Sequence, residues 1–235
     1  NVKVYLDFSS LIKSKTKISK IYIFSKEVNI DQLKKIIIKT KPSNLNSYII
    51  NKVQNAKLVT NVELYLNDNF EINNFIARGE VKKLNSIINN ELSLKNTSFN
   101  FFADTSDILI KNIKSEMDGF LIKEGNLQIS RNEKIELKSD FSTEIKINKN
   151  NIINYLPITK KIKFINQDTN FYANLDNFLD ISFDKTFKII SYNYTNKGKI
   201  NKSSFKFKKS LKNSFLQKNV NQFYLKDSKI NTRYA

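Results

Sequence analysis

Residues 97–130 read TSFNFFADTSDILIKNIKSEMDGFLIKEGNLQIS, and this stretch decides the fold class. Short apolar runs are separated by polar or glycine-containing breaks, and apolar pairs such as Phe99/Phe101 and Leu127/Ile129 lie two positions apart. Because successive side chains on a strand point to opposite faces, this spacing gives each strand one apolar and one polar face. Breaks that recur about every ten residues are typical of a meander of antiparallel strands.

The same period of two runs through most of the 235 residues. Parallel strands would need long helical crossovers, which are mostly missing from the pattern. The chain is therefore predicted to be mainly β and to form a meander of antiparallel strands with alternating apolar positions. These positions include Val62, Leu64, Leu66, Phe99, Phe101, Leu127, Ile129, Phe141, Ile145, Ile147, Ile181, Phe183, Phe205 and Phe207.

One region departs from the period of two. Residues 29–41 read NIDQLKKIIIKTK, in which Asn29 and Gln32 have the spacing of a capping box at a helix start. A second short helix is predicted over residues 45–53, where apolar residues recur at every fourth position. The two helices would form a short insertion near residues 29–55 that packs on the sheet.

The pattern predicts a single elongated domain, residues 1–235. Residues 151–157, which read NIINYLP, are expected to form either one helical turn or a hinge between two stretches of sheet. The chain begins with Asn1 rather than Met, so we expect it to be a segment of a longer protein. It contains no run of about 20 apolar residues, which is the length that a membrane-spanning helix requires.

The residue inventory argues against catalysis. The chain has neither Cys nor His, which excludes disulfides, zinc sites built on thiolates or imidazoles, and the Ser-His-Asp triad. Its four glycines form no phosphate-binding loop. The closest carboxylate pairs, Asp104 with Asp107 and Glu116 with Asp118, fall in predicted turns, where Asp is favoured because its side chain bonds nearby backbone. We expect no enzyme activity, no cofactor and no metal.

The formal net charge is +18, and residues 196–226 contain nine lysines and no acidic residue. Frequent Lys, Asn and Ile together are expected from an AT-rich genome, and the lysines would then form a solvated strand face. The alternative is a surface that meets anionic lipid headgroups. Nucleic acid is not an expected partner, because only three residues, Arg78, Arg131 and Arg233, are arginines and most Phe residues occupy alternating apolar positions.

Two stretches resemble a known family. They are residues 58–79, LVTNVELYLNDNFEINNFIARG, and residues 84–130, with the segments KNTSFNF, ILIKNIKSEMDG and GNLQIS. This succession of strands and turns is similar to the repeating β-strand region of AsmA-like envelope proteins, the TamB/YhdP superfamily. The likeness covers mainly residues 1–150, and the family has no catalytic residues to carry over.

The resemblance implies a role in the envelope of a Gram-negative bacterium. The fold that it implies is one long, curved antiparallel sheet, bent into a periplasmic β-groove with an apolar lining. This groove is thought to move phospholipids from the inner membrane towards the outer membrane, and members have an N-terminal anchor in the inner membrane. The 14 apolar positions given above would then face the acyl chains of lipid, and the anchor would lie outside these residues. The alternative is a structural or adhesive β-sandwich without a ligand, in which a second sheet covers the apolar face. Either architecture leaves the oligomeric state open.

Overall fold

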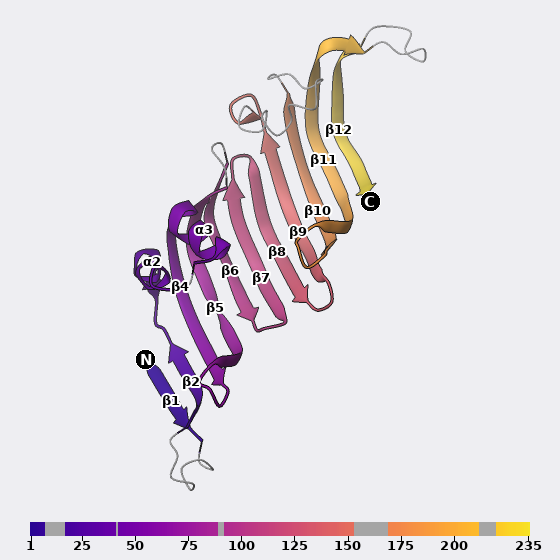
Figure 1. Ribbon diagram of the computed structural model, residues 1–235. Coiled ribbons are helices and arrows are strands. Elements are labelled where there is room, and N and C mark those ends of the chain that lie inside the picture. Colours follow the sequence, from indigo (N-terminus) through magenta and orange to yellow (C-terminus); the bar gives the residue numbers. More distant parts are fainter. Residues whose placement is uncertain (8–16, 41, 89–91, 153–168, 212–219) are drawn as a thin grey trace.

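The computed structural model describes residues 1–7, 17–40, 42–88, 92–152, 169–211 and 220–235, which fold around one antiparallel sheet (Figure 1). Its strands are β1 (Val2–Leu6), β2 (Ile18–Phe24), β3 (Val28–Asn29), β4 (Val53–Leu66), β5 (Ile72–Ile87), β6 (Ser93–Ala103), β7 (Asp107–Met117), β8 (Phe120–Arg131), β9 (Ile135–Ile147), β10 (Asn170–Phe183), β11 (Ile189–Leu211) and β12 (Val220–Tyr234). The prediction of a mainly β chain with a long, curved antiparallel sheet is confirmed.

The sheet follows the order of the chain. Its path is β1-β2-β4-β5-β6-β7-β8-β9-β10-β11-β12, and the short β3 pairs with β4 beside this path. The sheet is open, so β1 and β12 form its edges, and the two chain ends lie at opposite ends of it (Figure 1). Turns made of polar, turn-forming residues connect most of the neighbouring strands. For example, the Asn67 side-chain oxygen accepts hydrogen bonds from the backbone N–H groups of Asn69 and Glu71, both at 2.9 Å.

β-Bulges interrupt the ladders of several central strands. Lys83, Asn96 and Asn112 have φ of 52°, 49° and 57°, and each lies at a shift in register. The amide oxygen of Asn85 accepts a hydrogen bond from the backbone N–H of Asn96 at 2.9 Å. Bulges bend a strand and increase its local twist, which accounts for the curvature of the sheet.

The helical insertion is also confirmed. It comprises α2 (Ile30–Ile37) and α3 (Asn44–Lys52). The N–H of Asn29 donates to Gln32 Oε1 at 3.2 Å, as expected for a capping box. The α3 helix starts after Ser43, whose hydroxyl accepts a hydrogen bond from the N–H of Asn46 at 3.1 Å.

The two helices cover one corner of the sheet. Ile30 is buried against Val53 and Ala56, and Leu33, Ile49, Val81 and Leu84 pack around these three residues. A second cluster, formed by the strands alone, consists of buried Ile145, Ala173, Leu175 and Ile200. Both clusters lie on the same face of the sheet, the one that carries the apolar positions.

Within the described ranges, each extensive contact between strands joins neighbours in this one sheet. The two packed sheets of the sandwich alternative are thus not found in these ranges. Of the predicted hinge, residues 153–157 lie outside the described part of the chain. The strands on either side of it, β9 and β10, pair from Phe171↔Ile147 to Phe183↔Ile135.

Candidate functional site

A single row of apolar residues crosses the sheet from β1 to β11. Directly paired residues of an antiparallel ladder point to the same face, so the register of each pair can be followed from strand to strand. The row consists of Val2, Ile23, Val62, Ala77, Ala103, Ile108, Ile129, Leu137, Ile181 and Tyr192. We call the side of the sheet with this row the apolar face, and the opposite side the polar face.

The residues predicted to face lipid come together on the apolar face. The register places 13 of them there: Val62, Leu64, Leu66, Phe99, Phe101, Leu127, Ile129, Phe141, Ile145, Ile147, Ile181, Phe183 and Phe205. The side chain of Phe207 lies outside the described part of the chain. The prediction missed Ile108, Ile110 and Leu137. Ile108 and Ile110 are two positions apart, but the residue between them, Leu109, is apolar as well.

The apolar face is open over one part and closed over another. On β4, β6 and β8 the apolar residues, such as Leu64, Phe101 and Leu127, are only half-buried. Leu137 of β9 and Ile181 of β10 are half-buried as well. Towards the opposite end of these two strands, Ile145 is 7% exposed and Ala173 is 1% exposed, because side chains from adjacent strands pack over them. The half-buried part of the face around the apolar row, from β4 to β10, is therefore the accessible candidate site.

Polar side chains on the apolar face bond to one another. The hydroxyls of buried Thr97 and Ser115 are 2.6 Å apart. The buried amide of Asn177 donates to Thr143 Oγ1 at 3.1 Å and accepts a hydrogen bond from the Tyr194 hydroxyl at 2.8 Å. Satisfied in this way, these groups do not carry the full cost of an unpaired buried polar group.

The polar face carries ion pairs along its middle strands. Glu144 on β9 accepts from Lys123 of β8 at 2.8 Å and also pairs with Lys146. The Lys123 ammonium, and after it that of Lys146, lowers the pKa of the Glu144 carboxyl to about 2. These charges stay on the side of the sheet opposite the candidate site.

The Glu144 cluster predicts a measurable dependence of stability on pH. Because its folded pKa of about 2 lies below the ordinary 4.5, the cluster stabilises the fold above pH 4.5, and this stabilisation is lost as pH falls towards 2. Glu144→Gln removes this contribution, so urea unfolding is expected to show a smaller loss of stability between pH 4.5 and 2 in the variant. High salt screens the ion pairs, so it should reduce the difference in this loss of stability between the unmodified protein and the variant. Equal pH profiles at low salt would contradict the ion-pair account.

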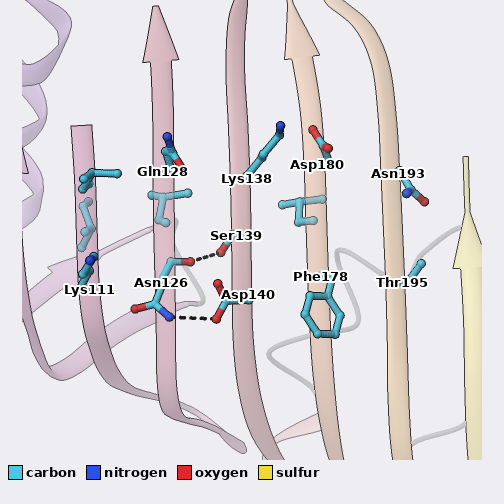
Figure 2. A pocket seen from close by; sticks show the side chains of 14 residues that line it. Lys111, Asn126, Gln128, Lys138, Ser139, Asp140, Phe178, Asp180, Asn193 and Thr195 are labelled. Carbon is cyan, nitrogen blue, oxygen red and sulfur yellow. Dashed lines mark hydrogen bonds between the residues drawn. The ribbon is translucent and has the colours of Figure 1, made fainter. Parts of the chain in front are cut away.

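The polar face also has a hollow of about 460 Å³ (Figure 2). Lys111, Asn126, Asp140 and Phe178 lie around it, and the Asn126 amide donates to Asp140 Oδ2 at 2.9 Å. The ring of Phe178 is 51% exposed there. The alternation of side chains did not predict this hollow, because it depends on how short and long polar side chains from five strands lie next to one another.

Of the carboxylates considered for catalysis, Asp104 holds a turn and Asp118 forms an ion pair, whereas Glu116 lies within β7 rather than in the predicted turn. Asp104 Oδ1 accepts from the N–H groups of Ser106 and Asp107, each at 2.8 Å, and these bonds lower the pKa of Asp104. Asp118 pairs with Lys95 at 3.0 Å. Among the described residues, no group of three or more acidic side chains is arranged to hold a metal ion.

The fold and this face define a class: an open, single-layer antiparallel sheet with one continuous apolar surface. No protein-family model, curated protein or solved structure matches the chain. Neither of the described helices is long and apolar enough to cross a membrane.

Proposed function

We propose that the protein binds the acyl chains of phospholipids on the apolar face and lets them move along it. In this proposal the chain is a segment of an AsmA-like Gram-negative envelope protein. It lies in the periplasm, joined to the inner membrane by an anchor outside these residues, and carries phospholipid between the inner and outer membranes. The observation that supports the proposal is the apolar row from Val2 to Tyr192, which no charged residue interrupts.

The energetics of such a face suit transport. Each CH₂ group removed from water contributes about 0.8 kcal/mol, so a long acyl chain gains enough to leave the aqueous phase. At about 4.8 Å between strands, the row of ten residues extends over roughly 43 Å. A chain that moves by one strand exchanges contacts with one set of apolar side chains for contacts with a similar set. Successive positions therefore differ little in energy.

The proposal also explains why the sheet forms a single layer in the described ranges. Burial of an apolar face against a second sheet would stabilise the fold more than leaving it half-exposed. In the described ranges, α2 and α3 cover only the corner around Ile30 and Val53, and the face around the apolar row stays half-exposed from β4 to β10. A large accessible apolar surface indicates an interaction with an apolar partner.

Uptake of lipid by the purified protein tests the proposal. After incubation with phospholipid vesicles and separation from them, native mass spectrometry is expected to show phospholipid bound to the protein. A fluorescent acyl probe should bind, and a lysophospholipid should displace it. Glycerophosphocholine, which has the headgroup but no acyl chain, should not compete. If no phospholipid is carried over and no acyl probe binds, the proposal is wrong.

A further inference from the structure

Apart from Lys206, six exposed basic residues gather on the polar face of β11 and β12. The register places them on that side of the two strands, next to one edge of the sheet. We call them the basic patch: Lys197, Lys199, Lys202, Lys226, Lys229 and Arg233.

The rest of the polar face has a different charge pattern. From β4 to β10, acidic residues such as Glu80, Asp140 and Asp176 alternate with basic ones, and many lysines are paired, for instance Lys95 with Asp118 at 3.0 Å. In the basic patch, the ion pair between described residues joins Lys199 to Asp227 at 2.8 Å. A genome-wide preference for lysine codons would raise lysine on all strands alike, so it does not explain this concentration on two of them.

The strand register places like charges opposite one another in the basic patch. Lys199 is directly paired with Lys229, and Lys202 with Lys226, across the β11–β12 ladder. Like charges at directly opposite positions destabilise a sheet. Lys197, Lys199 and Lys229 also line a hollow of about 430 Å³. Binding of anions would relieve the repulsion that the free protein retains.

The kind of anion follows from the residue types. Five of the six residues are lysines, which act as point charges and lack the planar fork with which arginine binds phosphates and bases bidentately. The exposed Tyr224 ring, on the same face, is of a type enriched where membrane meets water. An extended array of lysines with an aromatic neighbour fits a surface of many headgroups better than one phosphate chain.

We propose that the basic patch docks the β12 edge of the sheet on a bilayer that contains anionic phospholipid. This docking depends on headgroup charge, whereas the proposed function depends on acyl chains and the opposite face. The two therefore rest on different residues. Docking by this edge would bring the end of the apolar face close to the membrane.

Co-sedimentation with vesicles tests the docking. The unmodified chain should bind vesicles of equal parts phosphatidylcholine and phosphatidylglycerol, should bind phosphatidylcholine vesicles much less, and should dissociate as salt rises. The triple variant Lys202→Gln, Lys226→Gln, Lys229→Gln should bind the anionic vesicles roughly 100-fold more weakly, because each lysine close to an anionic bilayer contributes a factor of about five.

A matched variant, Lys82→Gln, Lys111→Gln, Lys114→Gln, changes the same number of lysines on the polar face of β5 and β7, and its vesicle binding should stay close to that of the unmodified chain. Thermal unfolding should show the patch variant to be no less stable, since two opposed lysine pairs are relieved. Equal losses in both variants would overturn the proposal, and so would binding to duplex DNA or RNA without binding to vesicles. An unchanged uptake of acyl probe by the patch variant would show that the two sites act separately.

Discussion

Phe101→Lys is expected to weaken the binding of an acyl probe roughly 10- to 100-fold while the sheet stays folded. Phe101 lies in the accessible part of the apolar face, paired with Gly79 on one side and Ile110 on the other. Its ring passes over Gly79, where an added Cβ would come within 3.0 Å of it. Loss of one large apolar contact costs about 1.5–3 kcal/mol of binding, and the ammonium would also have to be dehydrated beneath an acyl chain.

The matched control is Leu121→Lys. Leu121 is 36% exposed on the polar face of β8, where its paired neighbours are Glu116 and Glu144. A lysine there would face two carboxylates, so both folding and probe binding should be retained. Probe titration by fluorescence, with circular dichroism to verify folding, compares the two variants. An acyl site on the apolar face would be contradicted if both variants lost binding to a similar extent, or if neither variant lost it.

Alternation of side chains was sufficient to predict the faces of the sheet. A shift of one residue in any strand would have moved its side chains to the other face. Yet Val62, Leu64, Phe99 and Phe101 lie on the side to which their spacing assigned them. The helix start was equally local, since Asn29 and Gln32 are only three residues apart. Ser43 could have been read as the cap of α3 by the same rule.

The features that depend on distant parts of the chain were not predictable in this way. Whether Ile145 is accessible is decided by Ala173 and Leu175 of the next strand and Ile200 of the one after. The bulge at Lys83 has no local signal, because lysine has no special preference for positive φ, whereas Asn96 and Asn112 are of a type that tolerates it.

The charge of the polar face shows the same limit. The run of lysines in residues 196–226 is visible in the sequence, but Lys229 and Arg233 lie beyond it. Only the antiparallel pairing of β11 with β12 places Lys229 opposite Lys199 and Arg233 opposite Thr195, on the same face as the lysines of β11. A one-dimensional run of charge thus becomes a two-dimensional patch through the register of a hairpin.

Ile145→Asp is expected to lower the free energy of unfolding by about 3–5 kcal/mol, because it leaves an unpaired carboxylate among apolar side chains. Ile145 is 7% exposed, and Phe120, Ile147 and Phe171 pack around its cluster. Such a loss is a large fraction of the 5–15 kcal/mol that is typical of domains. Urea unfolding at neutral pH measures it.

Ile145→Val, which keeps the apolar character, should cost only about 0.5–1.5 kcal/mol. Burial would raise the pKa of the new Asp in the folded state. The free energy of unfolding of Ile145→Asp should therefore approach that of Ile145→Val as pH falls and the carboxyl takes up a proton. If Ile145→Asp unfolded like Ile145→Val at neutral pH, water would reach the cluster around Ile145, and the accessible site would extend from the apolar row to this end of β9 and β10.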